Sequence, residues 1–385
     1  MVTTKTADNV LKSYYLDVVS DQLNKSTNPL FAAIKQTTAD VWGRDVRKSV
    51  RFGGNGGIGA GDEDGALPTA TGTNYAQFVS TLKNLYGTIE ITDKAIRASA
   101  NNEGAFVNLL NDEMEGLVKS SAFNFSRMLF GDGTGKLETV SMVNPENKKQ
   151  LGMGSVRNFA EGMLIDIVSP SGEVVDTGVP VIAVDRDNNC ITVGIEDHHA
   201  ATGYTLHLQG SKDKEITGLA AIFGEGPLYG VDRTDNAWLK PYSASASTLT
   251  EEKILAAIDA VEEKSGSRPN FIVCSWGVRR ALYKLLSENK HVDTVELEGG
   301  YRAMSFNGIP VIADRFCPPH TMYILNTNDF ALHQLCDWQW LEGEDGKVLK
   351  QIAGKPVFTA TLVKYAELMC YRPCGQARLT GIIEA

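Results

Sequence analysis

A glycine-rich stretch between residues 53 and 72 limits what this chain can fold into more than any other feature. From residue 53 to residue 65 it reads Gly-Gly-Asn-Gly-Gly-Ile-Gly-Ala-Gly-Asp-Glu-Asp-Gly. Glycine loses more backbone freedom on ordering than any other residue, and this stretch has few apolar side chains to bury in return. Because it cannot be held by a core of its own, we expect it to lie on another surface.

The segments on either side of this stretch carry a strand pattern. Residues 46–52 and 75–92 alternate between polar and apolar side chains, which predicts the two legs of a long β-ribbon. An isolated two-stranded ribbon is only marginally stable in water. We therefore predict that the ribbon lies on a neighbouring copy of the same chain.

Length, composition and charge restrict the class of protein. The chain has 385 residues, enough for two or three packed lobes, and its 43% hydrophobic and 22% charged residues are ordinary for a soluble globular protein. Its net charge of −10 argues against a dedicated nucleic-acid binder, but not against a container that surrounds nucleic acid. The six cysteines show no metal or disulfide spacing, so we expect buried free thiols. No apolar run approaches the roughly 20 residues of a membrane span.

Periodicity divides the rest of the chain into successive segments. Apolar residues recur every three or four positions over residues 103–130, which predicts a long helix that ends at a glycine-rich turn. Gly116, near its middle, predicts close packing or a bend. Residues 152–216 form short alternating segments between turn clusters, which predicts a small antiparallel β-module. A capping signature at residues 248–251 predicts a helix to about residue 264, within a mixed α/β region.

Motifs for cofactors and catalysis occur only as fragments. Residues 54–59 match the dinucleotide-binding glycine pattern, but an acidic, non-helical run follows where a helix is required. Residues 185–196 place oxygen ligands at calcium-loop spacing, yet Cys190 stands where the turn needs glycine, so a hairpin turn is favoured. The pair at 198–199, two histidines, has no further ligand at metal spacing. We predict no cofactor, no metal and no catalytic residue. A cytosolic α/β enzyme built on residues 218–340 is the alternative from a different class of protein.

The order of the segments resembles a known family. An N-terminal arm, a glycine-tipped ribbon, a long helix, an α/β lobe and a final long strand follow one another, as in tailed-phage major capsid proteins of the Hong Kong 97 fold family. The resemblance is carried by residues 46–92, the helix exit Leu-Phe-Gly-Asp-Gly-Thr-Gly at 129–135, and residues 218–224, 306–314 and 323–325.

This resemblance implies an α+β capsid fold with a small inserted β-barrel-like domain. The implied parts are an N-terminal arm, an extended loop, a peripheral domain with a spine helix, the inserted β-module, a mainly axial domain, and a C-terminal strand that returns to the peripheral domain. Their expected bounds are 1–45, 46–92, 93–151, 152–216, 217–345 and 346–385.

The resemblance also implies a function and partners. The chain would be a non-enzymatic major coat protein that assembles into hexamers and pentamers, forming the icosahedral head around the double-stranded DNA of a tailed phage or prophage. It further implies assembly in the bacterial cytoplasm, a portal, DNA held without sequence-specific contacts, and no membrane partner. About 45 residues precede the ribbon, so a separate scaffolding protein is expected. An encapsulin-type compartment shell is the nearest alternative; the inserted module and the chain length weigh against it.

Five residues of the extended loop are expected to contact a neighbouring subunit: Arg51, Gly57, Asp62, Glu63 and Asp64. The last three form an acidic run at the loop tip. Opposite charges guide protein partners together, so we expect this run to dock on a basic patch of a neighbour. The basic residues expected to form that patch are Arg44, Arg47 and Lys48.

Overall fold

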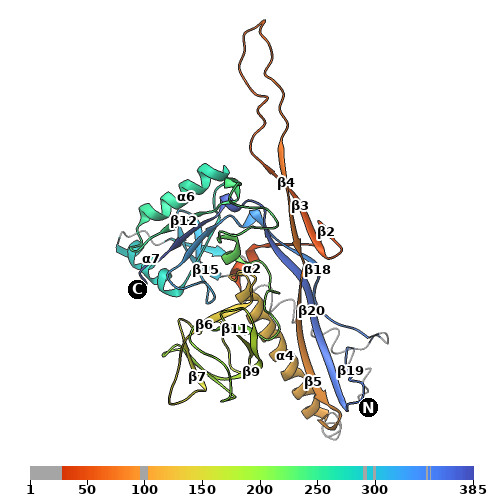
Figure 1. The fold of residues 1–385 in the computed structure, drawn as a ribbon. Helices are drawn as coiled ribbons and strands as arrows, with labels where there is room; N and C mark the ends of the chain where they lie inside the picture. Colours follow the sequence, from red (N-terminus) through yellow and green to blue (C-terminus); the bar gives the residue numbers. More distant parts are fainter. Residues whose placement is uncertain (1–27, 96–102, 289–292, 298–300, 344–345, 347) are drawn as a thin grey trace.

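The computed structural model describes residues 28–95, 103–288, 293–297, 301–343, 346 and 348–385. Figure 1 shows a long sheet lined by one helix, a mixed sheet flanked by two helices, a small barrel, and a thin ribbon that projects far beyond the rest. Most of the expected N-terminal arm, residues 1–27, lies outside the described residues. No helix within the described ranges is long and apolar enough to cross a membrane.

The long sheet is built around one extended C-terminal strand. Strands β18 and β5 flank β20, β5 running antiparallel to it over ten residue pairs. Helix α4 packs on one face, where Leu85 and Ile89 of the sheet meet Val118 and Phe125 of the helix in one buried cluster. Their bounds are β1 (Lys35–Thr37), β5 (Lys83–Thr92), β18 (Phe330–Trp340), β19 (Lys350–Gln351), β20 (Val357–Cys370) and α4 (Glu103–Met128).

The environment of Gly116 differs from the sequence expectation of close packing. A Cβ added at this position of α4 would have nothing within 4 Å, and the residue is exposed. The close approach between helix and sheet lies instead at Gly87 of β5, where an added Cβ would come within 2.9 Å of the Leu117 side chain. Sequence periodicity marks which helix face is buried, but it does not show which glycine of the pair makes the contact.

Replacing Gly116 by alanine is expected to stabilise the free subunit. Alanine in an exposed helix interior is favoured over glycine by about 1 kcal/mol. Urea unfolding followed by circular dichroism would measure the free energy of unfolding. Gly87→Ala is the matched control and is expected to destabilise, because its new methyl group would press on Leu117. A loss of stability in Gly116→Ala would contradict the open surroundings described above.

The seven-stranded sheet forms a second lobe with its own core. Its order is β12-β21-β17-β13-β16-β15-β14, and helices α6 and α7 flank it. Thr250 caps α6, its hydroxyl accepting a hydrogen bond from the Lys253 amide, and Gly266 ends the helix in the left-handed region at φ 67°. The bounds are β12 (Tyr242–Ser245), α6 (Glu251–Ser265), β13 (Phe271–Cys274), α7 (Trp276–Glu288), β14 (Asp293–Leu297), β15 (Tyr301–Phe306), β16 (Ile309–Ala313), β17 (Met322–Leu325) and β21 (Ala377–Thr380).

Between the long helix and the seven-stranded lobe the chain forms a closed six-stranded barrel. The barrel has a separate buried cluster that includes Leu151, Ile165, Ile191 and Leu206. It begins at Lys136, before the boundary at residue 152 expected from the sequence. The difference arises because closure of the barrel needs two additional strands, β6 and β7. The bounds are β6 (Lys136–Val143), β7 (Gln150–Met153), β8 (Leu164–Val168), β9 (Val174–Asp185), β10 (Cys190–Val193) and β11 (Thr205–Leu208).

The projecting ribbon is shorter than its sequence pattern indicated. Strand β3 pairs with β4 from Asp45↔Thr81 to Phe52↔Asn74, while β5 leaves the ribbon and joins β20 in the long sheet. Leu82, between β4 and β5, is buried at this change of partner. Alternation continues unbroken through both strands, so periodicity alone could not show that the partner changes. The bounds are β2 (Val41–Trp42), β3 (Asp45–Phe52) and β4 (Asn74–Thr81).

Candidate self-association surface

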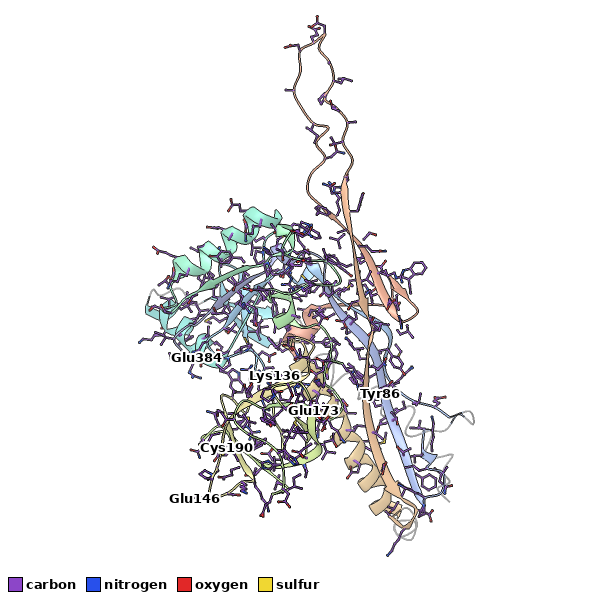
Figure 2. The ribbon with its side chains drawn as sticks, viewed as in Figure 1. Tyr86, Lys136, Glu146, Glu173, Cys190 and Glu384 are labelled. Carbon is purple, nitrogen blue, oxygen red and sulfur yellow. The ribbon has the colours of Figure 1, made fainter. Side chains whose placement is uncertain are left out.

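The tip of the ribbon, residues 53–73, has no supporting core. Almost every residue in it is exposed, and in Figure 2 its side chains stand in open space away from the rest of the chain. The two legs are joined by a bond from the Gly56 amide to the Thr71 hydroxyl at 2.7 Å, and Asn55 accepts a bond from the Gly57 amide at 2.8 Å. Ile58 and Leu67 are 86% and 90% exposed. The tip therefore presents unburied apolar and polar groups together.

The five expected contact residues fall into two groups in the structure. Gly57 and the acidic run of Asp62, Glu63 and Asp64 belong to the tip, where the Gly65 amide closes a turn onto the Asp62 carbonyl at 3.1 Å. Arg51 lies on β3, below the tip, directly opposite Tyr75 of β4. The structure thus brings the acids together and leaves Arg51 apart from them.

Stacked aromatic rings fix the inner face of the ribbon to the body. The Phe52 ring stacks on the Trp238 ring with the two centroids 4.7 Å apart. The Phe78 ring also lies parallel to the Trp238 ring, with centroids 5.9 Å apart. Phe78 also contacts the Tyr229 ring, and the Val79 amide donates to the Tyr229 carbonyl at 3.0 Å. The ribbon is therefore held as far as Phe52, and only the tip beyond it is unsupported.

A partly buried polar network, centred on the buried His333, holds the root of the ribbon. The His333 ring contacts the Ala39 carbonyl through Nδ1 at 2.8 Å and the Tyr371 hydroxyl through Nε2 at 2.7 Å. Burial lowers the pKa of His333, so the neutral ring donates from Nδ1 and accepts at Nε2. Lys48 pairs with Asp40 at 2.6 Å and its ammonium lies 5.6 Å from the Tyr371 ring centre. These bonds connect the root to the ends of β18 and β20.

The network predicts acid sensitivity. Folded His333 takes up its proton at a lower pH than the unfolded chain does, so between these two pKa values the unfolded state binds more protons. The free energy of unfolding should therefore fall as the pH drops below about 6.5, by at most about 1.4 kcal/mol per pH unit for this group. In the His333→Asn variant the free energy of unfolding should depend less on pH over this range, as measured by urea titrations at several pH values. His198→Asn, on the barrel, is the control and should retain the wild-type dependence; equal slopes for wild type and His333→Asn would refute the assignment.

The outward face of the ribbon root is basic and aromatic. Pairing register places Arg47 and Arg51 on the face opposite the Trp238 stack, together with Tyr75, Val79 and Trp42. Trp42, Tyr75 and Val79 are 70%, 67% and 37% exposed. The sequence analysis missed these apolar members, since the exposure of an aromatic residue in a strand depends on which face is covered. The alternation of residues along β3 and β4 was the sequence signal that could have identified this outward face.

The structure replaces one residue of the basic patch that the sequence analysis expected. Lys48 lies on the inner face and is paired with Asp40, so it does not join the outward basic side chains. Arg44 and Arg47 are 87% and 53% exposed, and both lie near Asp45, at 3.7 and 3.6 Å. Arg51 takes the place of Lys48 on the outward face.

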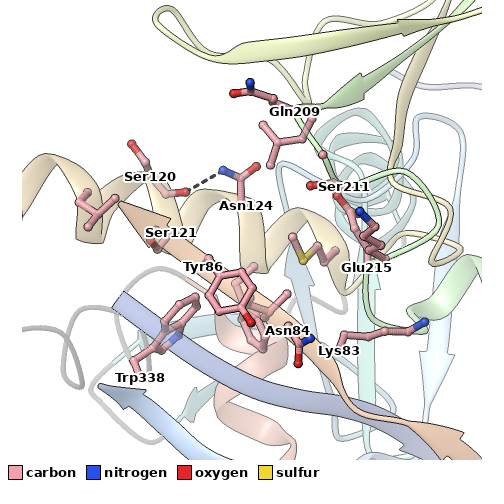
Figure 3. Close-up of a pocket in the computed structure, with 18 of the residues that line it drawn as sticks. Lys83, Asn84, Tyr86, Ser120, Ser121, Asn124, Gln209, Ser211, Glu215 and Trp338 are labelled. Atoms are coloured by element: carbon pink, nitrogen blue, oxygen red, sulfur yellow. Dashed lines mark hydrogen bonds between the residues drawn. The ribbon is translucent and has the colours of Figure 1, made fainter. Parts of the chain in front are cut away.

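A cleft lies where α4, β5 and the end of the barrel meet (Figure 3). It has a volume of about 570 Å³ and is lined by Lys83, Lys214 and Asp213 among others. On its helix wall the Asn124 amide donates to the Ser120 carbonyl at 3.1 Å. The lining includes serines but no histidine or cysteine, the usual groups that activate or supply a nucleophile. The cleft is thus a recess of mixed lining beside the barrel, with apolar side chains such as Leu85, Leu117 and Phe125 next to the polar ones.

The fold is similar to those of solved shell proteins. The capsid asymmetric unit of cyanophage A-1(L) matches at a TM-score of 0.60 with 11% identity, over 93% of this chain and 94% of that chain. The capsid of an empty GTA particle matches at 0.49 with 12% identity over 93% and 91%, and an encapsulin complex from Synechococcus elongatus PCC 7942 at 0.46 with 11% identity over 95% and 95%. No protein-family model and no curated protein sequence matches the chain.

The cyanophage match extends over nearly the whole of both chains, so the similarity is one of complete folds and not of a shared lobe. The chain has the fold of a viral shell protein. More narrowly, the fold is that of a tailed-phage major capsid protein, as the resemblance in sequence order predicted.

Proposed function

We propose that this chain is a major coat protein whose copies assemble into the closed head of a tailed phage. The observation that supports this proposal most strongly is the tip, residues 53–73. On a chain with a capsid fold, this tip extends far from the rest of its own chain. Exposed extended backbone with apolar side chains needs a partner surface, and a second copy supplies one. Arg51, Gly57, Asp62, Glu63 and Asp64 are the residues proposed to contact a neighbouring subunit.

The parts of the chain have proposed roles in a Hong Kong 97-like layout. The ribbon and tip form the extended loop, α4 with the long sheet forms a peripheral domain, and the seven-stranded lobe forms an axial domain at the centre of hexamers and pentamers. The barrel is the inserted domain. The enclosed cargo is double-stranded DNA, and a separate scaffolding protein and a portal complete the head, which assembles in the host cytoplasm. The net charge of −10 suits a wall that does not grip packaged DNA.

Assembly of the purified chain tests this function. The full chain, expressed alone and then with candidate scaffolding protein, would be analysed by sedimentation velocity and negative-stain microscopy. We expect capsomers, tubes or closed shells. A chain that stays monomeric at high concentration under both conditions would refute the coat function.

A further inference from the structure

We propose that the acidic tip of one copy binds the outward face of the ribbon root of the next copy. This acceptor face consists of Trp42, Arg44, Arg47, Arg51, Tyr75 and Val79. The inference rests on the proposed function, because it names the partner and the contact that would join subunits. It assigns to the tip a specific receptor on the same kind of chain.

The charges of the two surfaces are complementary. The tip carries the carboxylates of Asp62, Glu63 and Asp64, all exposed. The acceptor face carries three exposed guanidinium groups, two of which lie loosely beside a single carboxylate, that of Asp45. At distances of 3.6 and 3.7 Å neither arginine is tightly engaged, so both retain donors for an incoming carboxylate.

The apolar groups of the two surfaces also match. Ile58 and Leu67 project from the two legs of the tip, and each is at least 86% exposed. On the acceptor face Trp42 and Tyr75 are about equally exposed, at 70% and 67%. Tryptophan, tyrosine and arginine are the residues that most often dominate binding energy at protein interfaces. A face that combines them beside a matching acidic and aliphatic loop has the composition of an interface centre.

Geometry assigns the contact to a second copy. The tip continues the line of β3 and β4 away from the body (Figure 1), so the loop that carries the acids lies beyond the strand that carries Arg47 and Arg51. The inner face of the ribbon is already covered by Trp238, which leaves the outward face for the partner. Because donor and acceptor are different patches of one chain, each copy has one patch for each of two neighbours, and head-to-tail contacts of this kind close into rings when the rotation allows it.

Charge reversal on each side, and on both together, tests the contact. The variants are Asp62→Arg/Glu63→Arg/Asp64→Arg, Arg44→Glu/Arg47→Glu/Arg51→Glu, and the two combined. Each reversed set should raise the concentration needed for assembly at least tenfold, that is by about 1.4 kcal/mol or more, since like charges would then face each other. The combined variant should recover assembly. Reversal of three exposed barrel acids, Glu173, Asp187 and Asp197, is the matched control and should leave assembly unchanged.

A crosslink separates this contact from the function it rests on. Ser49→Cys with Glu63→Cys places one thiol on the acceptor face and one on the tip, and oxidation should give a ladder of covalent multimers. Shells without the ladder, or unaffected by the acid reversal, would overturn the contact and leave the coat function standing. A ladder without any shell would support the contact and refute the coat function. Folded reversed variants that fail to recover when combined would also overturn the contact.

Discussion

Removing one partner of the buried Arg127–Glu215 pair is expected to destabilise the subunit by about 3–5 kcal/mol. The guanidinium of Arg127 at the end of α4 holds both carboxylate oxygens of Glu215, Nη1 reaching Oε2 at 2.9 Å and Nη2 contacting Oε1. Their side chains are 4% and 3% exposed. Arg127→Met or Glu215→Leu would leave one charge buried without its partner. Urea unfolding of the free subunit measures the loss.

The double variant provides the control for this prediction. Arg127→Met combined with Glu215→Leu removes both charges together, and a buried ion pair replaced by apolar side chains is often neutral in stability. We expect the double variant to be clearly more stable than either single one. Additive losses in the double-mutant cycle would contradict the assignment of the pair as a coupled buried unit.

The second large effect is expected at Gly218, three residues further along. A Cβ at this position would collide with the carbonyl oxygens of Met128, Leu129 and Gly131, which belong to the end of α4 and the turn after it. Backbone oxygens cannot move aside as a flexible side chain does, so Gly218→Ala should force the linker off the helix end. We expect a loss above about 3 kcal/mol, within the range of severe overpacking.

Gly226→Ala is the matched control, because it lies in the same connection and is exposed, and an added Cβ meets nothing within 4 Å. It should change the free energy of unfolding by less than about 1 kcal/mol. Thermal and urea unfolding of both variants would show the contrast. Equal stability for the two would mean that the linker does not press on the helix end.

Sequence reasoning was most accurate where the decisive physics is local. The helix predicted for residues 103–130 appears as Glu103–Met128, since its apolar spacing and glycine-rich stop act within a few turns. The capping signature gave the right helix, but Thr250 caps it, two residues after the first threonine of the motif. Either threonine can accept an amide bond, and the choice depends on where the following chain packs.

Sequence reasoning was less accurate where distant segments decide. The predicted second leg of the ribbon, residues 75–92, divides at Leu82 into β4 and β5. It divides there because β5 pairs with β20, which lies about 280 residues further along the chain. The barrel boundary depends on β6 pairing with β11. The acidic tip could be found from composition alone, whereas the exposed positions of Trp42 and Tyr75 required knowledge of the opposite, covered face.

The barrel is entered and left through neighbouring antiparallel strands, Lys136 of β6 lying opposite His207 of β11. Adjacent strands are about 4.8 Å apart, so the two ends of the barrel need almost no connecting chain. The barrel can therefore be exchanged as a cassette: a short turn, or a foreign domain whose termini lie close together, fits between residues 135 and 209. For shell engineering, this junction is a ready position for displaying other proteins.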